Sequence, residues 1–513
     1  IKSKRPDFWA ARKRGIQMTG WEEILERETL TKEERKKVCG WLMTTESHMN
    51  NLIASYFTVK DFKAVWERKI GGGVIGGKAC GMLAARKLVQ LKLPECAAHL
   101  EPHNSYFIGT NVFYQYLVVN RCAELKAKHR LEKEHFKETE ELTNRLKTGT
   151  FPEEIRSRFK AMLEHYGTTP LIVRSSSILE DGYGNAFSGK YESVFCMNQG
   201  TIEERLQEFE EAVRRVYASV MDEAAIEYRR KRHLLDVDEQ MALLVQPVAG
   251  QEYGGLYFPV AAGMGCSYNP YKWMEQLNPE AGMLRMVTGL GTRAVERTPG
   301  DYPRLVGLDR AQANLRTTIA ERHKFSQRKV DVLDFGQRCL RTKSLEEIVP
   351  LLPKWQRHLV LSHDTEAEDL LAERHIYRKV YFADCQGLVE NQQFIHTMRS
   401  MLKLLEEEYG RPVDVEFAVT SPEEGSWKLN LLQCRPLQSS KSEQVHIPEG
   451  VDQELLFDVR RTSMRRSKEE PIDYIVWVGG KKYFEYPYAK KPDVARLIGR
   501  INQHFEDVDK KLM

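Results

Sequence analysis

The sequence lacks several features that mark particular classes of protein. It contains no apolar run near the roughly 18 residues that a membrane-spanning helix requires. Its basic N-terminal segment has no apolar stretch of the kind that a secretory signal carries. The nine cysteines are scattered, and no C-x-x-C pair indicates a disulfide framework or a structural zinc site. These absences predict a protein of the cytoplasm that keeps its thiols reduced.

The chain also lacks a strong net charge, low-complexity segments and internal repeats. Its 77 Lys and Arg residues and 73 Asp and Glu residues leave a net charge of only +4, which makes nucleic acid an unlikely partner. The basic cluster Lys2-Ser3-Lys4-Arg5 leaves RNA binding as an alternative, although a solvated N-terminal extension explains it better. With 513 residues, 42% of them hydrophobic, the chain is long enough for roughly two to four globular domains.

Hydrophobic spacing predicts a mixed chain of the α/β or α+β class. Helices are expected in residues 1–60, 82–93, about 121–147, from 201 onward and in the region of about 309–408. Strands are expected in residues 105–109, 171–173, 241–248, 255–262, 413–419 and 427–435, with a strand-like segment at 474–478 before a final helix. The helix that starts at Thr201 is the clearest, because Thr201 and Glu204 form a capping-box pattern ahead of an apolar stripe.

The most informative segment begins at the apolar run of residues 171–173. This run leads into Arg174 and three serines, and Glu180, Asp181 and a glycine-rich loop follow. A permanently charged guanidinium at a strand end, beside small hydroxyl residues and a flexible loop, suits a polyphosphate. A buried strand followed by a polar turn is the alternative interpretation.

A glycine cluster upstream resembles a P-loop but lacks two of its features. In the sequence from Gly72 to Ala79, alanine replaces the Ser or Thr that would hold magnesium after Lys78. The segment before the glycines is charged, whereas a P-loop follows a buried strand. From these residues alone, the cluster is the glycine-rich start of a helix with a surface lysine.

Two strands near residue 420 carry a set of polar side chains. The period of two places Asp414 and Glu416 on one face of the first strand, and it aligns Gln433 with Arg435 on the second. Oxygen ligands of this kind, next to a cation, suit magnesium bridged by phosphate oxygens. Cross-strand charge pairs on a surface hairpin are the alternative interpretation.

The order of these motifs resembles the nucleotide-binding domain of the phosphoenolpyruvate synthase and pyruvate phosphate dikinase family, a branch of the ATP-grasp group. The motifs are G-G-K at Lys78, R-S-S-x-x-x-E-D at Arg174, VQPV around Gln246, and D-x-E-F-A followed by L-x-Q-x-R-P around Glu416 and Gln433. The resemblance extends over about residues 70–440.

The resemblance implies a two-lobed ATP-grasp fold with a helical N-terminal extension. The extension would comprise residues 1–63, the first lobe 64–238 and the second lobe 239–440. Residues 441–513 would form a C-terminal region, the start of a further domain. Gln246 would lie in the second lobe, which would hold the nucleotide cleft and the metal ligands.

The resemblance also implies ATP and Mg²⁺ as cofactors and an ATP-dependent phosphotransferase activity. Lys78 and Arg174 would be the catalytic residues that contact the phosphates, and Glu416 and Gln433 would bind the metal. The whole nucleotide site would consist of Lys78, Arg174, Gln246, Asp414, Glu416, Gln433 and Arg435.

The sequence departs from the family in places that concern the phosphoryl acceptor. Family members pass the group to a histidine in a T-S-H motif on a separate domain, but no T-S-H occurs here, and His363 in the nearest string is expected on a helix surface. Pro259 and Thr292 replace a threonine and a glutamate of the family. The acceptor, a small molecule or a phospho-histidine domain, therefore stays open, as does the oligomeric state, a homodimer included. The alternative function is a catalytically reduced ATP-binding module with a regulatory or scaffold role.

Overall fold

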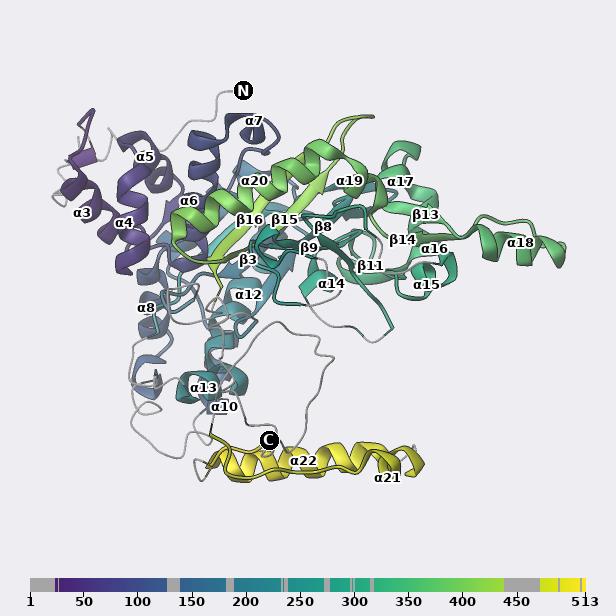
Figure 1. Ribbon diagram of the computed structural model, residues 1–513. Coiled ribbons are helices and arrows are strands. Elements are labelled where there is room, and N and C mark those ends of the chain that lie inside the picture. The colour runs from purple at the N-terminus through teal and green to yellow at the C-terminus, as the bar shows by residue number, and fades with distance from the viewer. Residues whose placement is uncertain are drawn as a thin grey trace, which may run out of the picture. The chain divides into compact units, whose positions relative to one another are not determined.

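The computed structural model describes residues 24–25, 27–126, 139–180, 189–231, 234, 239–271, 277–295, 298, 300–313, 318–437, 471–487, 490–507 and 510–513. These residues belong to two units, Ile1–Ser440 and Lys441–Met513. Figure 1 shows the helices and strands of both units and labels many of them. Among the residues described, no helix is long and apolar enough to cross a membrane.

Two five-stranded sheets organise the first unit. The first sheet has the order β1 (Lys69–Ile70), β2 (Tyr106–Ile108), β5 (Leu243–Pro247), β3 (Leu171–Ser175) and β4 (Ser193–Cys196). The second has the order β10 (Arg304–Gly307), β9 (Met283–Val287), β8 (Ala261–Cys266), β15 (Val413–Thr420) and β16 (Lys428–Pro436). Within these sheets the strand pairs are antiparallel, apart from β1 and β2, which are parallel.

Two smaller sheets accompany them. One has the order β12 (Cys339–Ser344), β11 (Lys329–Asp334), β7 (Leu256–Phe258) and β6 (Gln251–Tyr253), and the other pairs β13 (Leu361–His363) with β14 (Tyr381–Ala383). The region 309–408 was expected to be helical, and this prediction is wrong in part because it contains β11 to β14. Lys329–Val332 alternate polar and apolar residues with a period of two, which satisfies a strand but not a helix.

The helices of the first unit lie between and around these strands. They are α3 (Lys32–Leu42), α4 (Ser47–Tyr56), α5 (Val59–Glu67), α6 (Gly77–Lys92), α7 (Pro94–Ala97), α8 (Thr110–Val119), α10 (Thr139–Thr148), α11 (Glu153–Tyr166), α12 (Ile202–Ala218), α13 (Glu223–Lys231), α14 (Thr292–Val295), α15 (Ile319–Lys324), α16 (Leu345–Ile348), α17 (Lys354–Val360), α18 (Thr365–Glu373), α19 (Gln386–Glu390) and α20 (Gln392–Tyr409). Three short 3₁₀ helices are η1 (Ser219–Met221), η2 (Pro279–Ala281) and η3 (Val349–Leu351).

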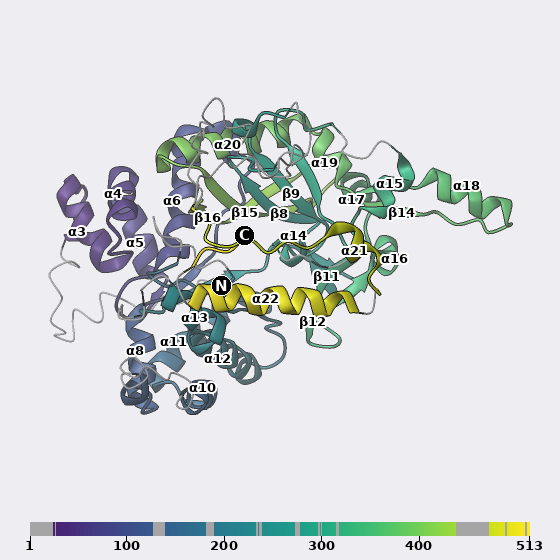
Figure 2. The same cartoon turned by 60° about the horizontal axis from the view of Figure 1, so that its bottom comes forward.

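Helix α12 confirms the clearest sequence prediction. The hydroxyl of Thr201 accepts a hydrogen bond from the backbone N–H of Glu204, and the Glu204 carboxylate accepts one from the backbone N–H of Thr201, so that both ends of the capping box are satisfied. The apolar stripe of α12 is buried in a core that it shares with α8, α11 and the first sheet. In Figure 2, α8, α10, α11 and α12 lie together in one group.

Helix α6 connects the two large sheets, because it packs against β16 of the second sheet and also contacts β5 of the first. The close approach to β16 depends on Gly81, where a Cβ atom would lie 2.1 Å from the carbonyl oxygen of Cys434. Helix α20 packs on β15 and β8 of the same sheet and also contacts α6. The first turn of α6 is thereby held where the two sheets come together.

Several element boundaries differ from the sequence predictions. The expected strand 255–262 is two strands, β7 and β8, because Pro259 has no N–H to donate to a ladder. Residues 251–253, between two of the predicted strands, form β6. The turn after it lies at Gly254-Gly255, whose positive φ angles of 58° and 85° suit a tight hairpin. Helix α6 begins at Gly77, five residues earlier than expected. Much of the charged helix expected in 121–147 lies outside the described residues.

The second unit contains two helices, α21 (Gly480–Glu485) and α22 (Lys491–Asp507). The final helix was predicted, but the strand-like segment 474–478 is not a strand. It makes one isolated bridge, between Tyr474 and Leu512. Tyr474 also packs its ring against Phe505 of α22, with a centroid distance of 4.6 Å.

Candidate functional site

The glycine cluster brings Lys78 next to the end of β3. Gly76 has a φ of +82°, and a Cβ atom there would lie 1.5 Å from the carbonyl oxygen of Ser176. A Cβ atom on Gly77 would lie 2.0 Å from the carbonyl oxygen of Glu180. Any side chain at either position would collide with backbone, so the pair of glycines is what lets α6 start against the serine-rich segment.

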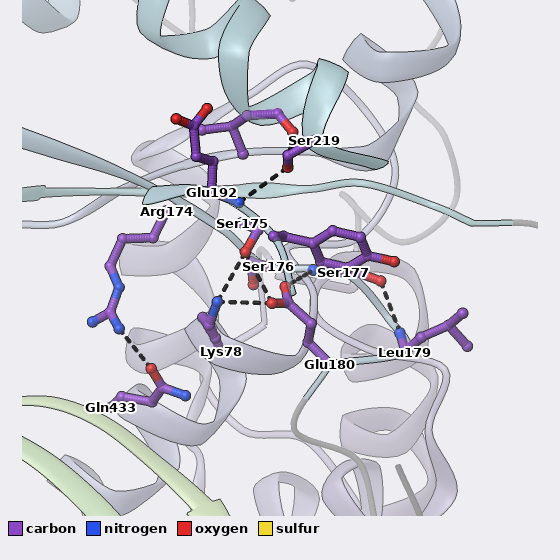
Figure 3. Close-up of polar contacts among 12 residues, drawn as sticks. Lys78, Arg174, Ser175, Ser176, Ser177, Leu179, Glu180, Glu192, Ser219 and Gln433 are labelled. Carbon is purple, nitrogen blue, oxygen red and sulfur yellow. Dashed lines mark hydrogen bonds and ion pairs between the residues drawn. The ribbon is translucent and has the colours of Figure 1, made fainter. Parts of the chain in front are cut away.

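Lys78 is buried and bound to this segment. Its Nζ atom lies 2.8 Å from the Ser175 hydroxyl oxygen and 2.8 Å from Oε1 of Glu180 (Figure 3). The other carboxylate oxygen of Glu180 accepts a hydrogen bond from the backbone N–H of Ser177 at 2.9 Å. Lys78 is 7% exposed and Glu180 1% exposed. The surface lysine inferred from the residues alone is therefore wrong, because the glycines draw Lys78 into the protein.

Arg174 extends from the same strand in another direction, toward the second sheet (Figure 3). Its Nη2 atom donates to Oε2 of Glu416 at 2.5 Å and to Oε1 of Gln433 at 2.7 Å. The side chain is 8% exposed. Among the described residues, its buried Nε atom has no hydrogen-bond partner. One nitrogen of the guanidinium thus makes both of these contacts with the second sheet.

The β15–β16 hairpin places the two acids opposite the arginine and the glutamine of the neighbouring strand. Asp414 lies opposite Arg435 and Glu416 lies opposite Gln433, with a bulge directly after Glu416. Arg435 holds Asp414 with three hydrogen bonds of 2.7, 2.9 and 3.0 Å. Such a bidentate pair fixes the hairpin next to Glu416.

The two carboxylates of the hairpin have opposite pKa shifts. Burial raises the pKa of Asp414 above its ordinary value, and the attraction of Arg435 only partly offsets it. Burial also acts to raise the pKa of Glu416, but the positive charges of Arg174 and Arg435 outweigh it, so its pKa is lowered. Glu416 is consequently held in its ionised form beside Arg174.

The donor set at this point fits a hard divalent cation. A carboxylate oxygen of Glu416 and the amide oxygen of Gln433 converge on a single cationic nitrogen. Oxygen ligands of these two kinds are the ones that Mg²⁺ takes in proteins. Among the described residues, a geometric cluster of His, Cys, Asp and Glu ligand atoms occurs elsewhere, at Glu95, Cys96 and His396, on α7 and α20.

A family model now places the chain among known proteins. The model described as "Pyruvate phosphate dikinase, AMP/ATP-binding domain" matches residues 73–455. The chain belongs to this family. No curated protein matched the chain at the threshold of the search.

Gln246 occupies a different sheet from the one expected for it. It lies on β5, which pairs with β2 and β3, so it belongs to the first sheet and not with Glu416 and Gln433. Its side chain nevertheless reaches the second sheet, because Nε2 donates to the carbonyl oxygen of Leu432 at 3.4 Å. Its buried Oε1 atom has no hydrogen-bond partner among the described residues.

Glu239 binds the segment Ser175–Ser177 from behind, a contact that the sequence did not predict. The Ser177 hydroxyl donates to Glu239, and the Tyr191 hydroxyl donates to the same carboxylate at 2.7 Å. Burial raises the pKa of Glu239, although Arg229 and both hydroxyl donors act in the opposite direction. A lone acid before a strand gives no local signal of this role. Asp181 and the loop up to residue 188 lie outside the described residues.

Thr292 and His363, which concern the departures from the family pattern, both bind acidic side chains. Thr292 donates its hydroxyl to Asp331 at 2.7 Å, and Arg293 binds the same carboxylate at 2.9 Å. Thr292 therefore belongs to a network with β11. His363 ends strand β13 and pairs with Glu368 at 2.9 Å, so the expectation of a helix-surface histidine is wrong.

Proposed function

We propose that this chain binds Mg-ATP where the two large sheets meet and transfers a phosphoryl group from it to an acceptor. Nucleotide binding follows from the family, which is an AMP/ATP-binding domain. The proposed place of binding and the phosphoryl transfer are supported by the contact of Arg174, on the first sheet, with Glu416 and Gln433, on the second. A permanent cation and two hard oxygen ligands meet there. Phosphoryl transfer depends mainly on positioning and on stabilising negative charge.

The proposed roles follow from the chemistry of each side chain. Arg174 offers a planar fork of donors to phosphate oxygens, and Lys78 adds a second positive charge next to the same strand. Glu416 and Gln433 are the proposed metal ligands, and Mg²⁺ would neutralise phosphate charge when it binds there. The Asp414–Arg435 pair positions the hairpin. The Oε1 atom of Gln246, which accepts no hydrogen bond from the described residues, is the proposed acceptor for a donor of the nucleotide.

In the proposed reaction, a nucleophile on the acceptor forms a bond to phosphorus while a phosphoanhydride P–O bond of ATP breaks. The electron pair of the broken bond stays on the departing nucleotide oxygen, where the positive side chains stabilise it. The resemblance favours a histidine on a separate domain as the acceptor, and a small molecule is the other choice.

Calorimetric titration with Mg-ATP, followed by assays of AMP, ADP and phosphate, tests the proposal. We expect binding by the wild type and loss of ATP consumption in Lys78→Met, Arg174→Met and Glu416→Gln. Lys160→Met is a matched control, because Lys160 pairs on the surface with Glu203 at 3.1 Å. Retained turnover in the three site variants, or no nucleotide binding by the wild type, would contradict the proposal.

The second candidate is a module that binds ATP without consuming it. The replacement of a family glutamate by Thr292, which is engaged with Asp331, favours this candidate. The same titration separates the two functions. Nucleotide binding without any product, in the presence of candidate acceptors, would support the sensor or scaffold role.

A further inference from the structure

The contact of Arg174 with Glu416 and Gln433 has a consequence for metal binding, if the proposed function holds. Both oxygens that would bind the metal already accept hydrogen bonds from one atom, Nη2 of Arg174, at 2.5 and 2.7 Å. A Mg²⁺ ion takes its oxygen ligands at about 2.0–2.1 Å. The ion and the guanidinium nitrogen therefore compete for the same space between the two oxygens.

A metal ion between these oxygens would also meet the positive charge of the Arg174 guanidinium. Arg174 is 8% exposed and Gln433 1% exposed, so a second positive charge beside the guanidinium would be poorly screened. Conversely, Glu416 loses its direct ion pair with Arg174 unless a metal ion takes the place of the guanidinium. Arg174 and a metal ion are thus alternative partners of the same two oxygens.

A nucleotide can drive this exchange because Arg174 is only partly satisfied where it is. Both of its contacts come from Nη2, while its buried Nε atom has no partner among the described residues. A phosphate group accepts two parallel bonds from an arginine fork, which is the stronger arrangement. Moving to a phosphate would give Arg174 that bidentate contact and would free the two oxygens for the metal.

Lys78 does not substitute for Arg174 in this exchange. Its ammonium group is bound to Ser175 and Glu180 at 2.8 Å each, within a cluster whose members are all buried. It acts on Glu416 only through space, as a minor contribution that lowers the Glu416 pKa.

We propose that Arg174 is an internal competitor of the metal: it holds Glu416 and Gln433 until a nucleotide phosphate binds its guanidinium. Metal alone then binds weakly, nucleotide alone binds weakly, and each strengthens the other. This coupling is reciprocal, as binding equilibria require.

The experiment titrates the chain with Mn²⁺, the paramagnetic substitute for Mg²⁺, and measures free Mn²⁺ by electron paramagnetic resonance. Titrations are made with and without the non-hydrolysable analogue β,γ-imido-ATP. For the wild type, we expect the analogue to raise Mn²⁺ affinity by at least about tenfold, within the usual range of such couplings. For Arg174→Met, Mn²⁺ alone should bind at least about tenfold tighter than to the wild type, and the analogue should add little.

Two further variants keep the test decisive. Arg174→Lys retains a cation for Glu416 but offers no fork to phosphate, so Mn²⁺ alone should bind weakly and the gain from the analogue should shrink. This variant preserves the charge balance if Arg174→Met proves unstable. Arg215→Met is the matched control, because Arg215 is half exposed and pairs with Glu192 on the surface. It should behave as the wild type does.

The outcomes distinguish this inference from the proposed function. Equal Mn²⁺ affinity of the wild type and Arg174→Met without nucleotide, or full coupling in Arg174→Lys, would overturn the competition while nucleotide binding could still stand. Failure of the wild type to bind the analogue with Mn²⁺ would instead overturn the proposed function.

Discussion

Replacement of Glu180 by alanine is expected to destabilise the first unit strongly. The Lys78–Glu180 pair is almost fully buried, at 7% and 1% exposure, and its two charged atoms are 2.8 Å apart. In Glu180→Ala the Lys78 ammonium stays buried without its counter-charge, which costs about 3–5 kcal/mol in comparable pairs. The backbone N–H of Ser177 also loses its acceptor, at about 1–3 kcal/mol, but these costs overlap because the groups share one carboxylate. We expect a total of about 4 kcal/mol.

Urea denaturation followed by far-ultraviolet circular dichroism measures this loss. The control is Glu141→Ala, which removes a half-exposed partner of Arg145 at 2.6 Å and should cost less than about 1 kcal/mol. The double variant Lys78→Met/Glu180→Leu should recover part of the stability, because it leaves no unpaired charge. If Glu180→Ala costs no more than Glu141→Ala, the Lys78–Glu180 contact does not hold the serine segment in place.

Two further predictions concern backbone packing and pH. Gly76→Ala should lower the melting temperature or prevent folding, because its Cβ atom would lie 1.5 Å from the Ser176 carbonyl oxygen; Gly425→Ala, also at positive φ but with open space around it, should cost only about 1 kcal/mol. A folded Gly76→Ala variant with the wild-type melting temperature would contradict the close approach. Burial, helped by Arg86 and Arg68, lowers the pKa of His103 from 6.5 to about 4. The unfolded chain therefore binds more protons between these values, and stability should fall as the pH drops from 6.5 toward 4, by up to about 3 kcal/mol. His103→Leu should remove this part of the acid loss in denaturation curves at pH 7, 5.5 and 4.5, and an unchanged acid limb would show that His103 is not its source.

The proposed function rests on a meeting of side chains from distant parts of the chain. Arg174 and Glu416 are separated by 242 positions in the sequence, and Lys78 and Glu180 by 102. The glycines at 76 and 77 and the glycine at 81 permit the close backbone contacts that bring these groups together. The site is therefore a product of backbone approach as much as of charged residues.

Local patterns were sufficient for the features that depend on near neighbours. The capping box of α12 joins residues three apart, and the period of two of a strand places Asp414 with Glu416 and Gln433 with Arg435. In both cases the residues that decide the feature lie within a few positions of one another. The same reasoning failed in 309–408, where helices alternate with four strands and β11 pairs on its other side with the distant strand β7.

The sequence by itself determined the family, the α/β class and the identity of the polar residues at the proposed site, because motif order and local periodicity are properties of the chain alone. Tertiary structure decided which cation meets which acid. It buried Lys78 against Glu180, placed Gln246 in the first sheet, and set Arg174 on both predicted metal ligands. These pairings depend on how two sheets and one helix pack, and such packing is a sum over many distant contacts that no single segment encodes.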